Sequence, residues 1–263
     1  MMARLAMVLF SIAAARPAGA QLAPPNPAGV SMGHLHILVK DVEASRRLWV
    51  KGLGAEPVML GPMELLKFPG VLVALREGDP TGGTEGSTVN HLGFLVRDLA
   101  AAEARWKAAG GEIYETRPNP NQLFLRFPGD LKVELTEDPS LGVPIAHHHV
   151  HFYTPSVEAA RAWYVKTFGA VAGRRGKFEA ADIPGANLSF SAAQGEVAGT
   201  RGRALDHIGF EVKNLESFCR RLEQQGVRFD VPYRFVERLG VWVAFFTDPW
   251  GTYIELTEGL GRL

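Results

Sequence analysis

Residues 206–212 have the sequence DHIGFEV, and three other stretches resemble it: GHLHILV at 33–39, NHLGFLV at 90–96 and HVHFYTP at 149–155. Each has a histidine near its start and then runs apolar or alternates, which is the pattern of a strand with at least one buried face. Together with His147 and His148, these stretches contain all eight histidines of the chain. A pattern that recurs four times predicts an internal repeat.

Two of the four repeats also end in matching carboxylate-bearing stretches, KVELTE at 132–137 and YIELTE at 253–258. His91 precedes His207 by 116 positions, and Glu134 precedes Glu255 by 121 positions. The nearly constant spacing indicates a duplication whose two halves align with small insertions.

Each histidine stretch is followed by a helical pattern and then by three short apolar stretches separated by turn residues. Residues suited to begin a helix follow the strands, and a glycine suited to end it comes after each helical pattern. The predicted N-caps are Asp41, Asp98, Ser156 and Asn214, and the closing glycines are Gly54, Gly110, Gly169 and Gly226. The sequence therefore predicts an α+β protein built from four βαβββ units.

The composition favours a small-molecule partner. The 263 residues are 46% hydrophobic and 21% charged, and the 28 Lys and Arg balance the 28 Asp and Glu. A chain without net charge or a basic run is not expected to bind nucleic acid or an anionic membrane. Cys219 is the only cysteine, so no intramolecular disulfide is expected.

The N-terminus has the pattern of a secretory signal peptide over residues 1–20. A short basic start is followed by an apolar run from Leu5 to Ala15 and a small-residue cleavage pattern before Gln21. The apolar run is shorter than the roughly 20 residues that span a bilayer. We therefore expect a periplasmic or secreted protein that leaves the membrane after cleavage, with residues 21–31 as a flexible linker.

The repeated histidines and glutamates predict a metal site. Two imidazoles and one carboxylate leave coordination positions open, and they suit Fe²⁺, Mn²⁺, Zn²⁺ and Ni²⁺ alike. The predicted ligands in the second half are His149, His207 and Glu255, and a second set in the first half is His34, His91 and Glu134. His34 and His36 share a strand face, as do His149 and His151, so one of each pair can ligate while the other supports it.

The fourfold unit, the histidine strand starts and the ending TDPWGTYIEL at 247–256 resemble the vicinal oxygen chelate superfamily. This superfamily includes glyoxalase I, fosfomycin-resistance transferases, bleomycin-binding proteins and extradiol dioxygenases. The resemblance implies that two units pair into one cupped, eight-stranded mixed sheet with a metal inside the cup. The repeated pattern divides the chain into a first domain at 32–138 and a second at 145–259, and the resemblance implies one potential site in each.

The sequence departs from the enzymes of this superfamily at two places, and these departures limit the classes of reaction that it is expected to catalyse. Extradiol dioxygenases carry a tyrosine at the position of Phe245 and a histidine several residues earlier, where this chain has 236–238 as VER, so ring cleavage is disfavoured. Glyoxalase I needs a further glutamate from a unit's last strand, where this chain has ANLSF at 186–190.

The resemblance thus implies a divalent-metal-dependent lyase, isomerase or oxygenase whose substrate chelates the metal through neighbouring oxygens. Trp242, Phe245 and Arg238 are the predicted substrate-binding residues, and Glu237 and His151 are candidate general bases. One metal ion is expected in the second domain, and a second one can be held by the first. The alternative is an exported protein of the bleomycin-resistance type that binds or sequesters a small molecule without turnover.

Overall fold

The structure is a computed structural model that describes residues 22–115 and 117–263. The predicted signal peptide at 1–20 lies outside the described residues. The first unit contains β1 (Val30–Val39), α1 (Val42–Arg47), the π-helix η1 (Leu48–Gly52), β2 (Glu56–Leu60), β3 (Met63–Phe68) and β4 (Val71–Glu77). The second contains β5 (Val89–Val96), α2 (Leu99–Ala108), β6 (Glu112–Ile113), β7 (Gln122–Phe127) and β8 (Leu131–Glu137).

The second half repeats this order. The third unit contains β9 (Ile145–Thr154), α3 (Val157–Phe168), β10 (Val171–Arg175), β11 (Phe178–Ile183) and β12 (Ala186–Ala192). The fourth contains β13 (Leu205–Val212), α4 (Leu215–Gln224), β14 (Phe229–Val236), β15 (Val241–Thr247) and β16 (Tyr253–Glu258), followed by the 3₁₀-helix η2 (Leu260–Arg262). The predicted α+β class and the four βαβββ units are confirmed.

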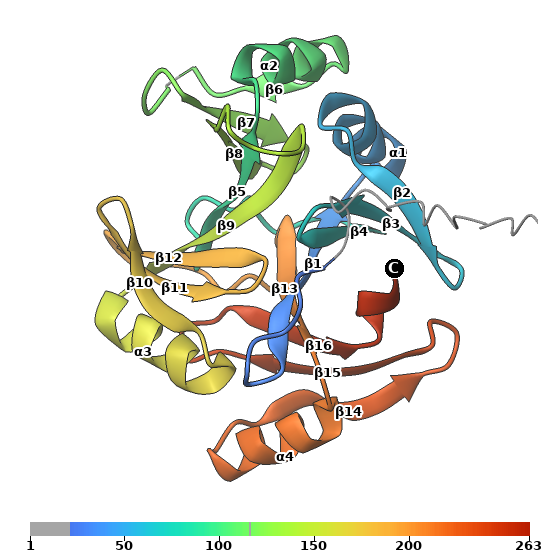
Figure 1. Ribbon diagram of the computed structural model, residues 1–263, viewed down its shortest axis with the longest axis vertical. Helices are drawn as coiled ribbons and strands as arrows, with labels where there is room; N and C mark the ends of the chain where they lie inside the picture. The colour runs from blue at the N-terminus through green and yellow to red at the C-terminus, as the bar shows by residue number, and fades with distance from the viewer. Residues whose placement is uncertain (1–21, 116) are drawn as a thin grey trace, which may run out of the picture.

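The units pair into two mixed eight-stranded sheets, but not in chain order. One sheet has the order β14-β15-β16-β13-β1-β4-β3-β2 and joins the first unit to the fourth, whereas the other has the order β10-β11-β12-β9-β5-β8-β7-β6 and joins the second to the third (Figure 1). The antiparallel pairs β1–β13 and β5–β9 close the two junctions. The prediction that 32–138 and 145–259 each form one sheet is therefore wrong.

The lengths of the connections account for this pairing. Residues 138–144, between β8 and β9, form the shortest link between two units, and the units that they join share a sheet. Residues 78–88 and 193–204 are longer and cross from one sheet to the other. The two crossings hydrogen-bond to each other, since the Thr88 N–H donates to the Ala198 carbonyl and the Ala204 N–H to the Gly82 carbonyl. Each crossing segment thus satisfies backbone groups of the other.

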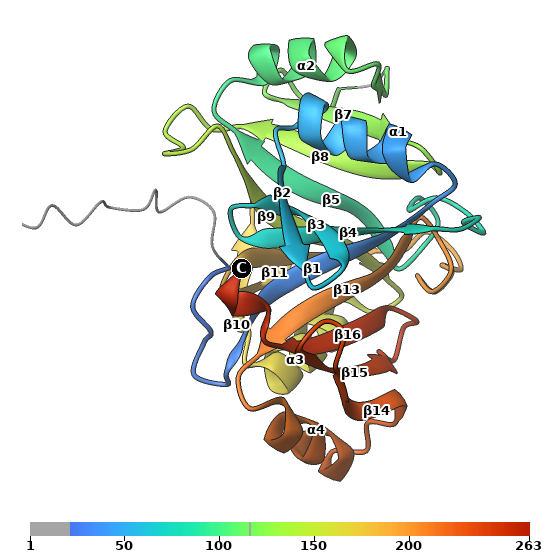
Figure 2. The ribbon, with the colours of Figure 1, turned by 90° about the vertical axis from the view of Figure 1, so that its right-hand side faces the viewer.

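The first and second units, and likewise the third and fourth, pack through helical residues rather than by pairing their strands. Trp49 of η1 stacks on Phe127 of β7 with ring centroids 4.3 Å apart, and Phe168 of α3 packs on Phe210 of β13 at 4.4 Å. Helices α1 and α2 lie toward one end of the molecule and α3 and α4 toward the other (Figures 1 and 2). One apolar core therefore spans residues of all four units.

The helix caps follow the sequence with one exception. Asp41, Asp98 and Ser156 accept hydrogen bonds from backbone N–H groups in the first turns of α1, α2 and α3. Asn214 makes no side-chain cap, and instead Glu258 accepts the N–H of Leu215 at 2.8 Å. Three of the four predicted caps are confirmed.

The segment before β1 is tied to the fold. Residues 22–29 contain no helix or strand, but the Asn26 amide donates to the carbonyls of Phe168 and Gly169 at 3.0 and 3.1 Å. Val30 and Ser31 already belong to β1, so the predicted flexible linker at 21–31 is wrong over these residues. Among the described residues, no helix is long and apolar enough to cross a membrane.

Candidate metal centres

Each sheet gathers histidines and a glutamate where its two units meet. Site 1, in the sheet of the first and fourth units, consists of His34 and His36 of β1, His207 of β13 and Glu255 of β16. Site 2, in the other sheet, consists of His91 of β5, His149 and His151 of β9, and Glu134 of β8. The antiparallel pairs set His36 opposite His207 and His91 opposite His151.

In site 1 two imidazoles converge on one carboxylate oxygen. His34 Nε2 lies 2.8 Å and His207 Nε2 2.9 Å from the same Oε2 of Glu255. Asp206 Oδ1 lies 2.7 Å from His207 Nδ1 and accepts its N–H, which directs the lone pair of Nε2 toward the centre. A carboxylate that orients a histidine in this way is a common feature of metal sites.

The charges of site 1 favour a cation at its centre. Burial by itself raises the pKa of the Glu255 carboxyl, but the charges of His34 and His207 and their hydrogen bonds hold that pKa well below its usual value. Burial lowers the pKa of His207, yet its hydrogen bonds to Asp206 and Glu255 raise that pKa above the ordinary value. The two carboxylates thus stabilise positive charge at the position where a metal ion would be held.

His36 completes site 1 with an uncharged, unpaired nitrogen. Burial and the charges of His207 and His34 lower the pKa of His36 to about 3, so its ring is neutral at neutral pH. Its Nε2 is buried without a hydrogen-bond partner among the described residues, as is Nδ1 of His34. Three imidazoles and one carboxylate, with ligand atoms within 4.8 Å of one another, match the donors that Fe²⁺, Mn²⁺, Zn²⁺ and Ni²⁺ accept.

The two units of a site are equivalent in position but not in chemistry. In the fourth unit Glu255 is paired with Gly209, two residues after His207, and in the first unit Ala74 is paired with His36, two residues after His34. Ala74 therefore occupies the position equivalent to Glu255. In site 2 Ser189 is in the same way equivalent to Glu134. Each site therefore has three histidines but only one glutamate.

Gly209 and Gly93 are required by the close approach of a histidine ring. A Cβ built on Gly209 lies 2.0 Å from Cε1 of His34, and one built on Gly93 lies 1.9 Å from Cε1 of His149. No side chain fits at such a distance, so both His-x-Gly stretches are matched to the His-x-His stretch of the neighbouring strand.

Site 1 lies at the wall of an apolar cavity of about 210 Å³ in the cup of its sheet. Leu60, Met63, Val243 and Phe245 contribute to the apolar lining. Arg234 and Arg238 also line the cavity, and both are exposed. A second, more polar pocket shares His207 and Phe245 with this cavity and is also lined by Arg76, Arg201 and Tyr253.

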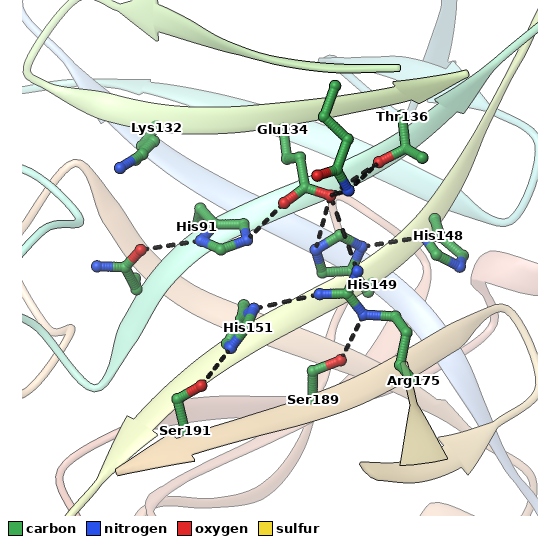
Figure 3. A network of polar contacts seen from close by, with 12 residues as sticks. His91, Lys132, Glu134, Thr136, His148, His149, His151, Arg175, Ser189 and Ser191 are labelled. Atoms are coloured by element: carbon green, nitrogen blue, oxygen red, sulfur yellow. Dashed lines mark hydrogen bonds and ion pairs between the residues drawn. The ribbon is translucent and has the colours of Figure 1, made fainter. Parts of the chain in front are cut away.

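Site 2 is built on the equivalent strands β5, β8 and β9, but different side chains surround its ligands (Figure 3). His91 Nε2 lies 3.2 Å from Glu134 Oε2, and His149 Nε2 lies 3.9 Å from Glu134 Oε1. Gln122 and Thr136 donate hydrogen bonds to Glu134 Oε1 at 3.1 and 2.8 Å. Burial raises the pKa of Glu134, but His91, Thr136 and Arg175 together lower it to about 2.

Arg175 reaches into site 2 from the end of β10. Its guanidinium donates to Ser189 Oγ at 2.8 Å and to His151 Nδ1 at 3.2 Å, and it lies 3.8 Å from Glu134 Oε1 (Figure 3). Burial and the charges of His91 and Arg175 lower the pKa of His151 to about 3, and burial and the charge of Arg175 lower that of His149 far below its ordinary value. Site 2 therefore contains a cation of the protein itself, in contact with His151 and near Glu134.

The predicted metal ligands are regrouped by the structure. The prediction that His149, His207 and Glu255 form one site is wrong, because the sheet pairing brings His34 to His207 and Glu255. For the same reason His34, His91 and Glu134 do not form one site, since His91 and Glu134 lie with His149. All six residues belong to one of the two sites, but compared with the prediction His34 and His149 have changed places.

The other predicted site residues divide into two groups. Phe245 and Arg238 line the cavity of site 1. Trp242 does not, because it lies on the opposite face of β15 from Val243 and Phe245 and stacks on Tyr233 with centroids 4.6 Å apart. Its predicted role in this cavity is wrong. Of the candidate bases, Glu237 is exposed and does not line the cavity, and His151 belongs to site 2.

Sequence reasoning missed several residues that shape the sites. Asp206 carries a local signal, because a carboxylate directly before a predicted ligand histidine is well placed to orient it. His36 was not included in a predicted ligand set, although its spacing from His34 places both on one strand face and so allows both to ligate. Ala74 and Arg175 carry no such signal, because only the strand pairing brings them to the sites.

Comparison with known proteins supports the fold. Residues 146–256 match the model of the Glyoxalase/Bleomycin resistance protein/Dioxygenase superfamily. The chain is similar to glyoxalase I from Zea mays, with a TM-score of 0.66, 15% sequence identity and coverage of 89% of this chain and 94% of that chain. It is also similar to a putative dioxygenase from Bacillus subtilis subsp. subtilis str. 168, with a TM-score of 0.64, 14% identity and coverage of 90% and 86%. No curated protein matches the sequence.

The matched residues comprise the third and fourth units, which lie in different sheets. The two similar structures cover most of the chain, so the likeness extends to both sheets. The resemblance found in the sequence is confirmed at the level of the fold: the protein has the glyoxalase/dioxygenase fold, and its residues 146–256 match the Glyoxalase/Bleomycin resistance protein/Dioxygenase superfamily model.

Proposed function

We propose that the protein is a divalent-metal-dependent enzyme of the glyoxalase/dioxygenase type, with its active centre at site 1. The observation that carries the proposal is the convergence of His34, His207 and Glu255, with the unpaired His36 beside them, at the wall of a cavity. Such a donor set would hold Fe²⁺, Mn²⁺, Zn²⁺ or Ni²⁺ and leave positions for substrate oxygens. The bound ion would act as a Lewis acid that stabilises negative charge on two neighbouring oxygens of the substrate.

The cavity supports a small substrate with an apolar body and an anionic group. Its lining is mostly aliphatic near Leu60, Met63 and Val243, so an apolar part of the substrate would displace water there. Arg234 and Arg238 make no ion pair with any described residue, and their guanidinium groups would bind a carboxylate or phosphate. Phe245 borders both the cavity and the polar pocket, and would contact the substrate beside the metal.

The donor set also bears on the class of reaction. Glyoxalase I, which the sequence resembles, needs a further glutamate, and Ala74 stands at the position equivalent to Glu255. Isomerisation by a carboxylate base at that position is therefore disfavoured, and a lyase or oxygenase that uses three histidines and one glutamate is favoured. The same alanine favours a second candidate function, binding or sequestration of the small molecule without turnover.

Metal analysis tests the proposal directly. Mature protein purified without chelator or metal-affinity resin is expected to contain Fe, Mn, Zn or Ni by mass spectrometry, and His207→Ala and Glu255→Gln are expected to lose this metal. His148→Ala is the matched control, because His148 lies outside site 1. Retention of full metal content in both site 1 variants would contradict the proposal.

Turnover separates the enzyme from the binding protein. Protein reconstituted with each of the four metals is incubated with 2-oxo acids, 2-hydroxy acids and catechols, and the mixtures are analysed by mass spectrometry. A product that requires both metal and His207 supports the enzyme. A ligand that changes the visible spectrum of the Co²⁺-substituted protein but is recovered unchanged supports the binding function.

We further propose that the protein is exported, with cleavage before Gln21. The proposal is supported by the basic start, apolar run and small-residue pattern of residues 1–20. Mass spectrometry of the intact protein from cells of its source is expected to show a chain beginning near Gln21. A chain retaining residues 1–20 would contradict it.

A further inference from the structure

Site 2 holds an arginine where a metal ion would be expected from its ligands. The Arg175 side chain is largely buried, with 17% of its surface exposed, and its guanidinium contacts Ser189, His151 and the carboxylate of Glu134. An arginine is always protonated in proteins, so this charge is permanent. We infer that Arg175 takes the place of a metal ion in site 2, and that the chain therefore binds one divalent ion, at site 1.

In site 2 the protein's own donors already engage His151 and Glu134, whereas Nε2 of His91 and Nε2 of His149 have no hydrogen-bond partner among the described residues. His151 Nδ1 accepts a hydrogen bond from Arg175, while its Nε2 lies 2.9 Å from Ser191 Oγ and serves as the donor. Glu134 Oε1 accepts from Gln122 and Thr136. In site 1, by contrast, Glu255 has only His34 and His207 as described partners, both of them potential ligands.

The guanidinium also opposes a second cation by its charge. It neutralises Glu134, the one carboxylate of site 2, whereas site 1 combines Glu255 with a second carboxylate, Asp206. Two like charges in a buried environment repel each other more strongly than in water. A divalent ion in site 2 would have to displace Arg175 from its three partners or remain beside it.

The repeat identifies the residue that site 1 has in place of Arg175. Arg175 is the last paired residue of β10 before the turn to β11, opposite Phe178. Leu60 is the last paired residue of β2 before the turn to β3, opposite Met63. The two residues are therefore equivalent, and Leu60 lines the cavity of site 1. The same position is apolar beside the proposed metal centre and cationic in the other site.

This equivalence defines the test. Metal-free protein is titrated with Zn²⁺ by calorimetry, and Co²⁺ absorption reports the ligand set. The wild type is expected to bind one equivalent, and Arg175→Leu, which copies site 1, is expected to bind two, with Zn²⁺ affinity at site 2 raised at least 100-fold. Adding His149→Ala to Arg175→Leu should return the count to one. Arg174→Leu is the matched control, because Arg174 is exposed and bonds away from the site, to the Lys177 carbonyl.

The outcomes are distinct. Two equivalents in the wild type, one of them lost in His149→Ala, would overturn the inference, as would one equivalent in both the wild type and Arg175→Leu with an unchanged circular dichroism spectrum. Arg175→Gln, which can still donate to Ser189, replaces Arg175→Leu if the leucine variant does not fold, and the same two equivalents are expected. The inference rests on the proposed metal binding at site 1, but the two can be refuted independently. No metal in the wild type and one equivalent in Arg175→Leu would refute metal binding at site 1 and support the role of Arg175 in site 2. No metal in either protein would overturn both.

Discussion

His34 Nε2 lies 2.8 Å from Glu255 Oε2, although 221 positions separate the two residues in the chain. The contact exists because β1 pairs with β13, which in turn pairs with β16. Site 1 is therefore made from the first and the last unit of the chain and forms only when both units share one sheet. Its ligands cannot be brought together by either half alone.

Gly209→Ala is expected to weaken metal binding at site 1. The added methyl group would lie 2.0 Å from Cε1 of His34, so the ring has to move away from Glu255 and His207. We expect a loss of about 10–100-fold in metal affinity, the size seen when a metal site loses a supporting group. Titration of the metal-free protein measures it. Gly93→Ala places a methyl at 1.9 Å from His149 in site 2 and is the control. Equal affinities at site 1 in the two variants would contradict this prediction.

Asp206→Ala is expected to weaken the same site through the orientation of His207. Asp206 accepts the N–H of His207 Nδ1 at 2.7 Å, and it also accepts the backbone N–H of Gly202 at 2.7 Å. Without the carboxylate the ring is free to change tautomer, and metal affinity should fall about 10-fold or more. Asp206→Asn keeps an oxygen acceptor and should lose less. Metal affinities that do not rank in this order would argue against an orienting role.

Asp248→Ala is expected to destabilise the fold without changing metal content. Asp248 accepts hydrogen bonds from the N–H groups of Trp250 and Thr252 and from the hydroxyl of Tyr164, and thereby joins α3 to the segment between β15 and β16. Losing a buried carboxylate with three donors should cost about 3 kcal/mol. Tyr164→Phe removes one of these bonds and should cost about 1 kcal/mol. Urea denaturation measures both, and a larger loss in Tyr164→Phe would refute the assignment.

His147 should make the metal-free protein less stable in mild acid. Burial lowers the pKa of His147 to about 4, from an ordinary value of 6.5, so the folded state keeps this ring neutral. Above pH 6.5 both states are neutral and His147 has no effect. As pH falls from 6.5 to 4 only the unfolded chain takes up the proton, and stability is lost at about 1.4 kcal/mol per pH unit.

The variant His147→Gln isolates this contribution. The glutamine amide can donate to the Gly185 carbonyl, which His147 Nδ1 contacts at 2.9 Å, but it does not titrate. Denaturation of metal-free wild type and variant at several pH values should give curves that diverge below pH 6.5, with the wild type losing more stability. Parallel curves between pH 6.5 and 4 would show that the ring of His147 is protonated as easily in the folded state as in the unfolded chain.

The sequence predicted the secondary structure well because its signals are local. Histidine-bearing strands, the caps at Asp41, Asp98 and Ser156, and the glycine after α3 at Gly169 depend on residues within a few positions of one another. The prediction failed at Asn214, where the helix N-terminus is satisfied by Glu258 from a strand 43 positions away. The prediction that Trp242 binds substrate failed because the aromatic character of a residue does not reveal which face of β15 lines the cavity.

The four equivalent units, and the histidines and glutamates on their inner strands, follow from local sequence patterns alone. The pairing of units into sheets does not, and it is this pairing that brings Glu255 to His34 and His207 and Glu134 to His91 and His149. Strands pair through backbone hydrogen bonds, which are the same for every unit of a repeat, so the local patterns do not distinguish one partner from another. The choice between partners depends on the connections at 78–88, 138–144 and 193–204 and on the helices packed between neighbouring units, and these act only when the whole chain is folded.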